Sequence, residues 1–449
     1  MKDRLLDIAH KAAQKAEGFG ADQAEVYIGS TRSFSIDVEN NAIKSASDKR
    51  DAGCGIRSVV GKKVGFAYVT TVQESDLIEA AEKSVKLAKA SVEDPHFISL
   101  PSVRASYPDV KGLFDPRIQA LDSEDAADLI ARGVDATSHA LEGYKFAIEG
   151  KLGVSTGARV IVNSLGISCS AESTSSWMYM SPTIKTETDQ TSSYELQVSR
   201  TLKDIDPDWI GRTSAENAVN NLGAKTVEGG DMPVILAPLA SGTVLGGGFA
   251  GAVNAEEVQY GRSYISDAFG EEIASVSLHL VDDGLLPGGV GSRSFDAEGF
   301  PSQKTEVIEN RVLKSLLHNS YTANKDDVDN TGNASRPSYS GVPSISTSNL
   351  VVTPGKGSLD DLVSEVGKGI LCRNTGDRPN MTTGDLSAMV MEGAYFENGE
   401  IQHPVKSTLV GINMRDLLQR VEMVGEDTRV SLSIISPSIV ISSAKVSSG

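Results

Sequence analysis

The sequence has few cysteines, few histidines and no long apolar run. Its three cysteines are odd in number and far apart, which argues against a disulfide framework and suits a reducing compartment. They are Cys54, Cys169 and Cys372. No stretch is apolar enough to span a bilayer or to act as a signal peptide, so we expect a cytoplasmic protein without a membrane segment. The six histidines are scattered, and the metal motifs H-E-x-x-H and C-x-x-C do not occur.

Positive charge is also scarce. The chain has 60 Asp and Glu against 42 Lys and Arg, which gives a net charge of -18. Such a balance repels phosphate backbones and anionic lipids, so it disfavours direct binding to nucleic acid or to a membrane surface. A chain of 449 residues is long for a single core, and its length predicts two domains.

The apolar pattern changes character about halfway along the chain. Helical spacing and strand-like alternation are mixed in residues 1–225, which predicts an α+β domain whose antiparallel sheet carries helices on one face. The helices are predicted at 5–16, 75–90, 123–141 and 207–222, and strand-like runs include 24–28, 33–38, 55–60, 145–153, 158–163 and 194–200. Short strands and turns dominate residues 226–449. We predict a β-rich, barrel-like or sandwich domain there, with one or two helices, near 240–257 and 414–421.

Three Glu-Asn pairs lie between apolar flanks. They are Glu39-Asn40, Glu309-Asn310 and Glu397-Asn398. Asparagine tolerates the left-handed backbone of a tight turn, so each pair predicts a β-hairpin. We assign these hairpins to the scaffold and attach no chemistry to them.

Residues 246–251 read Gly-Gly-Gly-Phe-Ala-Gly and satisfy the dinucleotide-binding pattern G-x-G-x-x-G. That pattern is meaningful only where a strand runs directly into a glycine turn that opens a helix. Here the strand-like run 233–237 ends several residues earlier, so the glycines are predicted to lie inside a helix. Small residues recur every four positions, at Gly242, Gly246, Ala250 and Asn254. This spacing places them on one helix face, where another element can approach closely.

A series of short motifs follows in the second half of the chain. They are Val281-Asp282-Asp283-Gly284, Phe295-Asp296-Ala297-Glu298-Gly299, Thr331-Gly332-Asn333 with Arg336, Thr383-Gly384-Asp385 and Val424-Gly425-Glu426-Asp427. Together with the glycine-rich stretch 53–65, this order and spacing resembles the TldD/PmbA family of zinc metallopeptidase subunits over essentially the whole chain.

Active members of that family carry H-E-x-x-x-H on a helix and a further cysteine ligand near the C-terminus. Imidazole and thiolate hold the zinc, and the glutamate deprotonates a bound water. Counting back from Val281, the positions of the two histidines correspond to Gly246 and Gly251, and the position of the glutamate corresponds to Gly247. In the region where the cysteine is expected, residues 431–437 read Ser-Leu-Ser-Ile-Ile-Ser-Pro. The resemblance therefore implies an E-type (TldE- or PmbA-like) member with no catalytic or metal-binding residue and no cofactor of its own. Zinc is then expected in a D-type (TldD-like) catalytic partner.

Four residues of these motifs are candidates for peptide binding or for a structural role in the family. They are Asp282, Asp283, Asn333 and Arg336. The two aspartates suit either acid–base work or a turn before Gly284. Arg336 suits either a bidentate pair with a peptide carboxylate or a structural salt bridge.

The sequence allows two further sites. A metal site could be assembled from distant residues, for instance His318, Cys372 and Asp283. Cys372 could act as a nucleophile with His403, although its place at the end of an apolar run is more typical of a small buried residue.

Three functions remain open. In the first, the chain is a non-catalytic pseudoenzyme subunit of a zinc-dependent peptidase complex and shapes the chamber that processes unfolded or small peptides. Such peptides would bind in extended form by strand addition. The alternatives are a homodimeric peptide-binding scaffold without hydrolytic activity and a metallopeptidase with unrecognised ligands. Because the expected ligands and general base are absent, the chain alone is predicted to be inactive.

Overall fold

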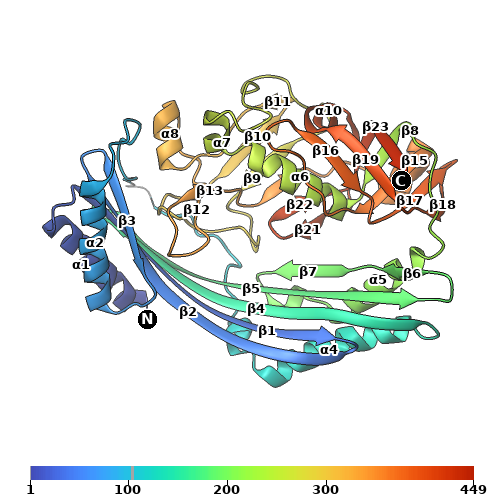
Figure 1. Ribbon diagram of the computed structural model, residues 1–449, viewed down its shortest axis with the longest axis horizontal. Coiled ribbons are helices and arrows are strands. Elements are labelled where there is room, and N and C mark those ends of the chain that lie inside the picture. Colours follow the sequence, from blue (N-terminus) through green and yellow to red (C-terminus); the bar gives the residue numbers. More distant parts are fainter. Residues whose placement is uncertain (1, 103–105, 449) are drawn as a thin grey trace.

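The computed structural model describes residues 2–102 and 106–448. Its N-terminal half is built on one antiparallel sheet with the strand order β3-β2-β1-β4-β5-β6, in which β7 also pairs with β5. The strands are β1 Gln23–Glu39, β2 Ala42–Val60, β3 Lys63–Val69, β4 Lys145–Asn163, β5 Ser168–Lys185, β6 Gln190–Ser192 and β7 Glu195–Ser199. Four of them are 17 to 19 residues long, and strands of this length twist and bend. The sheet therefore curves along its length (Figure 1).

Residue alternation gives this sheet two different faces. The helices are α1 Lys2–Gly18, α2 Glu74–Ala90, α3 Pro116–Ala120, α4 Ser123–Ala140 and α5 Pro207–Asn220, and a 3-10 turn spans Leu202–Asp204. Val26 packs in the apolar cluster beneath α1 and α2, and Ile36 of the same strand packs in the cluster beneath α4. Tyr27 points to the opposite face and packs against Phe295 of the C-terminal half. The predicted sheet with helices on one face is confirmed.

The C-terminal half contains two larger sheets. One includes the order β16-β19-β23-β8-β15-β17-β18, with β20 beside β23, and the other has the order β11-β10-β9-β14-β22-β21. The strands are β8 Gly230–Leu236, β9 Leu280–Asp283, β10 Lys304–Glu309, β11 Val312–Leu313, β12 Ala334–Ser335, β13 Ser344–Ile345, β14 Leu350–Val352, β15 Lys368–Asn374, β16 Asp385–Met389, β17 Glu392–Glu397, β18 Glu400–Pro404, β19 Thr408–Asn413, β20 Val421–Val424, β21 Arg429–Ser431, β22 Ile434–Ser436 and β23 Ile439–Ser448. The last of these strands, β23, lies in the middle of its sheet.

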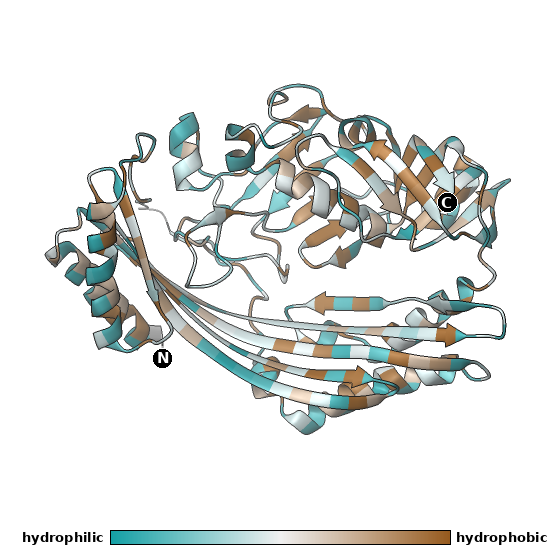
Figure 2. Cartoon of the chain, in the orientation of Figure 1, coloured by the Kyte–Doolittle hydropathy of each residue, from teal (hydrophilic) through white to brown (hydrophobic). Residues whose placement is uncertain are grey.

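The β-rich character predicted for this half is confirmed, but it holds five helices instead of one or two. They are α6 Pro238–Ala252, α7 Ala255–Gln259, α8 Ser320–Asp326, α9 Leu359–Val366 and α10 Met414–Gln419. Three of them span only five to seven residues, which is too short to display a helical period in the sequence. Apolar and polar residues alternate along the strands of both halves (Figure 2).

The three predicted hairpins are confirmed. They join β1 to β2, β10 to β11 and β17 to β18. Both turn residues have positive φ in each case, at Asn40 and Asn41, Asn310 and Arg311, and Asn398 and Gly399. This is the backbone that matches the right-handed strand twist in a two-residue turn. Within the described ranges, no helix combines the length and apolarity needed to cross a membrane.

Candidate functional site

The glycine run lies inside α6, as predicted, and not in a phosphate-binding loop. The helix begins at Pro238, where the fixed backbone of proline suits the first turn. Each helical glycine costs about 1 kcal/mol relative to alanine, so tertiary packing must offset this loss. Val244, Leu245 and Phe249 supply that packing, because all three are fully buried in the main core of the C-terminal half.

Side chains from other segments cover the three glycines at which the family resemblance leads us to expect zinc ligands and a general base. A Cβ atom would lie 2.6 Å from Cγ1 of Ile434 at Gly246, 2.9 Å from Cγ of Arg378 at Gly247 and 3.0 Å from Cε of Met381 at Gly251. Distances this short leave no room for an imidazole or a carboxylate without movement of those neighbours. The residues present here therefore do not fit a zinc ion.

The small-residue face of α6 allows the close approach predicted from its spacing. Strands β21 and β22 lie against it, and Gly242 faces Ser431 and Ser436. The hydroxyl of Ser241 lies 2.7 Å from that of Ser436 and donates to the carbonyl of Pro437, also at 2.7 Å. This is the segment in which active relatives are expected to carry their cysteine, and here Ser436 and the carbonyl of Pro437 bond to the glycine helix.

The alternative metal set is not assembled. Among residues 2–102 and 106–448, no three His, Cys, Asp or Glu side chains form a group that could hold a metal ion. The thiol of Cys372 is buried in the core, which raises its pKa to about 12, and it donates to the carbonyl of Asn374 at 3.5 Å. Asp283 instead accepts a hydrogen bond from the backbone of Leu285 at 2.8 Å, while burial lowers the pKa of His318.

Cys372 and His403 form no nucleophile–base pair either. The ring of His403 stacks on Tyr395 with 5.5 Å between ring centroids. Its Nδ1 lies 3.0 Å from the carbonyl oxygen of Pro404. The interpretation of Cys372 as a small core residue agrees with this arrangement.

The structure brings together Asp282 and Asn333. The carboxylate of Asp282 is buried and accepts hydrogen bonds from Nδ2 of Asn333 and from the backbone of Ser348, each at 2.6 Å. Burial raises the pKa of Asp282 to about 6. Its neighbour Asp283 bonds to Leu285 as a turn residue does, so the turn role that we weighed is the one seen.

Arg336 forms a structural ion pair and not an open carboxylate site. It donates to Glu25 of β1, and both side chains are fully buried. Arg57 of β2 donates to Glu25 at 2.8 Å and to Glu298 at 2.9 Å, which extends the pair into a network between the two halves. No sequence motif points to Glu25 or Arg57, because a charged residue in an alternating strand is usually solvated.

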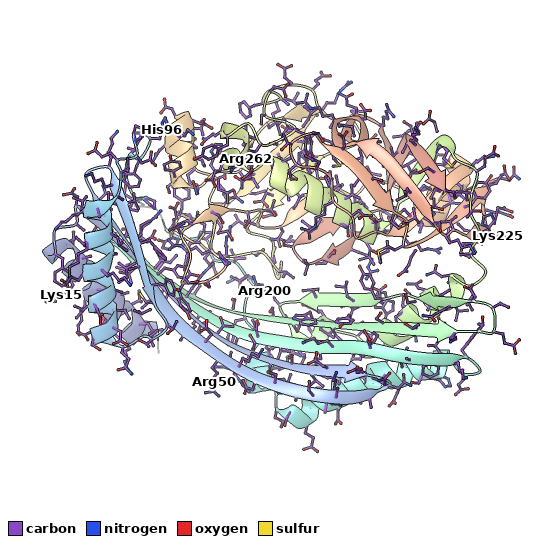
Figure 3. All side chains as sticks on the ribbon, viewed as in Figure 1. Lys15, Arg50, His96, Arg200, Lys225 and Arg262 are labelled. Atoms are coloured by element: carbon purple, nitrogen blue, oxygen red, sulfur yellow. The ribbon has the colours of Figure 1, made fainter. Side chains whose placement is uncertain are left out.

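A groove separates the sheet of the N-terminal half from the C-terminal half. It consists of three adjoining cavities of about 360, 560 and 600 Å³. The first and second share Val290, and the second and third share Leu196 and Val198. Arg200 lines the first cavity, and Figure 3 shows it between the two halves. We refer to these three cavities together as the central groove.

Two edge strands that contact each other line the second cavity. Its walls include residues 196–199 of β7 and Arg429 and Val430 of β21. Each strand is the last of its sheet among the described residues. Arg429 bridges them, because it donates to Glu195 at 3.0 Å and to the carbonyl of Leu196 at 3.2 Å. Edge strands offer backbone donors and acceptors that an extended peptide can use.

Comparison with known proteins defines the class as metallopeptidase-like. Sequence profiles of one family match three successive parts of the chain: PmbA/TldA metallopeptidase domain 1 at residues 24–88, the central domain at 117–222 and the C-terminal domain at 229–448. The chain belongs to the PmbA/TldD family, as its motifs predicted.

Individual relatives span nearly the whole chain. An uncharacterized protein of Methanocaldococcus jannaschii is 28% identical, with 98% of each chain covered. A metalloprotease TldD homolog of Buchnera aphidicola is 27% identical over 91% of this chain and 86% of its own. The crystal structure of TldE from Thermococcus kodakarensis is 24% identical and covers 98% of this chain and 100% of its own, with a TM-score of 0.89. That likeness confirms the fold.

Proposed function

We propose that this chain is the non-catalytic, E-type subunit of a zinc-dependent peptidase, and that a D-type partner of the same family holds the zinc. One observation carries the proposal. Glycines occupy the three positions of α6 where the family resemblance leads us to expect the ligands and the general base, and Ile434, Arg378 and Met381 lie against them. Helix α6 is stabilised by these contacts and presents no metal ligand at the three positions. Hydrolysis therefore needs a second subunit that holds the metal.

In this role the chain supplies part of the peptide-binding surface. The edge strands β7 and β21 provide backbone groups in the wall of the second cavity, which suits an extended peptide. Trp177, Tyr179 and Leu432 line the third cavity and offer apolar contacts to its side chains. Cavities of about 360 to 600 Å³ favour unfolded or small peptides over folded domains. A cytoplasmic location belongs to the same proposal and is supported by three free cysteines.

The test uses three samples: this chain alone, a D-type relative with intact H-E-x-x-x-H alone, and the two together. We expect cleavage of an unfolded protein such as reduced, carboxymethylated casein only in the mixture, and zinc only in the D-type chain. A mixture made with a D-type chain whose motif glutamate is replaced by glutamine serves as the control.

Two outcomes would contradict the proposal. Stoichiometric zinc or cleavage by this chain alone would favour a metallopeptidase with unrecognised ligands. Peptide binding by a homodimer that forms no complex with any D-type chain would favour the scaffold without hydrolytic activity.

A further inference from the structure

We propose that the first cavity of the central groove is a subsite for the carboxylate of a bound peptide, held by Arg159, Arg200 and Arg293. These residues come from β4, from the segment after β7 and from the loop after β9, and all three line the cavity. The inference rests on the proposed function only in taking a peptide as the ligand.

The three guanidinium groups have backbone partners but no carboxylate partner. Within the described ranges, none of them lies in an ion pair. Arg159 donates to the carbonyl of Phe295 at 2.8 Å and its guanidinium lies 4.7 Å from the centre of that ring. Arg200 donates to the carbonyls of Gly289 at 3.2 Å and Ser292 at 3.1 Å. These contacts fix the positions of both side chains, and in the described part of the chain no carboxylate accepts a hydrogen bond from either of them.

Arg293 is the least satisfied of the three. Its one hydrogen bond runs from Nη2 to the carbonyl of Gly332 at 3.4 Å, and its Nε is buried without a partner in the described part of the chain. A buried donor of this kind costs free energy unless a ligand accepts from it. Arg293 therefore has donors available for an incoming oxygen atom.

Mutual repulsion makes the group receptive to an anion. Burial and the charge of Arg293 lower the pKa of Arg159, and burial together with both neighbours lowers the pKa of Arg200 to about 10. Burial raises the pKa of Asp282 and of Asp296 and the charge of Arg293 lowers it in part, but other donors already bond to their oxygens. Asp282 accepts from the side chain of Asn333 and the backbone of Ser348, and Asp296 accepts from backbone amides. A bound carboxylate would offset the repulsion and accept bidentate hydrogen bonds from the guanidinium forks.

The shape and walls of the cavity favour a carboxylate at the end of a short chain. The floor is made of small residues, including Gly29, Gly157 and Ala171, which leave a volume of about 360 Å³. Asp51 and Glu172 also line the cavity and disfavour a dianion such as phosphate more than a single carboxylate. Because Val290 also lines the second cavity, a peptide that ends here can continue into that cavity.

Isothermal titration calorimetry on the full chain tests the inference. The probes are the tripeptide Leu-Ala-Ala with a free C-terminus, the same tripeptide with a C-terminal amide, and inorganic phosphate. We expect the free acid to bind at least tenfold more tightly than the amide, since hydrogen bonds to a charged group are stronger than those to a neutral one. Equal binding of acid and amide, binding of phosphate alone, or no binding would each overturn the inference.

Variants locate the site. Arg293→Gln should weaken binding of the free acid by tenfold or more and leave binding of the amide unchanged. The matched control is Arg50→Gln, because Arg50 is exposed on β2 and lies on the opposite face from its neighbour Asp51 (Figure 3). If Arg293→Gln retains the preference for the acid, the site is wrong. Should that variant fail to fold, Arg159→Gln takes its place with the same expected outcome.

The assay needs neither zinc, nor a partner, nor hydrolysis. Failure of the two-subunit peptidase test would leave the acid–amide preference intact. Loss of that preference would equally leave the subunit assignment untouched.

Discussion

Arg336 donates a hydrogen bond to Glu25, and both side chains are fully buried although 311 positions separate them in the chain. Glu25 also accepts from Arg57, which in turn pairs with Glu298. One carboxylate on β1 is thus shared by two guanidinium groups, one from each half of the molecule. The network joins the curved sheet to the C-terminal half near the end of the sheet where α1 and α2 lie (Figure 1).

Replacement of Glu25 should be strongly destabilising. Glu25→Ala leaves two buried guanidinium groups without their common partner, and such a loss costs about 3–5 kcal/mol of unfolding free energy. Urea denaturation followed by circular dichroism measures it. The control is Glu397→Ala, which removes an exposed ion pair with Lys368 and should leave the midpoint unchanged. A Glu25→Ala protein as stable as the parent would contradict a structural role for the network.

Two glycines of α6 should respond in opposite ways to the same substitution. Gly242→Ala places its Cβ 3.6 Å from Ser431, an ordinary contact, so the gain in helix propensity should stabilise the protein by up to about 1 kcal/mol. Gly246→Ala places its Cβ 2.6 Å from Cγ1 of Ile434, and overpacking of this kind costs about 1–3 kcal/mol. Differential scanning calorimetry of the two variants compares them directly. Equal melting temperatures would show that β22 does not pack tightly against the small-residue face of α6.

Asp282 should make stability depend on pH. Burial raises its pKa in the folded protein to about 6, above the value near 4 expected in the unfolded chain. The protonated form is therefore favoured by folding, so its contribution is present below pH 4 and is lost as pH rises through about 6. The change is on the order of 3 kcal/mol, because each pKa unit corresponds to about 1.4 kcal/mol.

Asp282→Asn tests this dependence, since the variant does not titrate at that position. The unfolding free energy of the variant minus that of the parent should rise between pH 4 and pH 7 in urea titrations. A constant difference across that range would show that Asp282 keeps an ordinary pKa.

The three cysteines should be inert in the folded protein. All are buried, and burial raises the pKa of Cys169 and of Cys372 to about 12 and that of Cys54 even further. Thiolates are the reactive form, so a thiol reagent such as dithionitrobenzoate should label none of them at pH 8 and all three in guanidinium chloride. Rapid labelling of Cys372 in the native protein would revive its interpretation as a nucleophile.

Local features of this fold were predictable and the groove was not. The hairpin at Asn40 and the helix around Gly246 depend on neighbouring residues, and both follow from the sequence. Strand β1 was predicted in two pieces, 24–28 and 33–38, because Gly29 and the polar residues after it interrupt the apolar pattern. In the structure β1 is continuous, since hydrogen bonds from β2 and β4 hold it on both sides.

The first cavity of the central groove could not be predicted from the sequence either. Arg159, Arg200 and Arg293 share no motif, and only the packing of the two halves brings them to one cavity. By contrast, Gly246, Gly247 and Gly251 could be singled out because a family pattern gives their positions a chemical meaning. What lies against them, above all Ile434, required the structure.

The central position of β23 has a consequence for biosynthesis. Strand β8 is complete by residue 236, but β23, one of its two neighbours beside β15, exists only when residues 439–448 have been made. About two hundred intervening residues, including the apolar helix α6, are therefore synthesised before β8 can pair with β23. A high share of pairings between residues far apart in the chain slows folding and prolongs the exposure of apolar, aggregation-prone segments. We therefore expect this half of the molecule to depend on chaperones during synthesis.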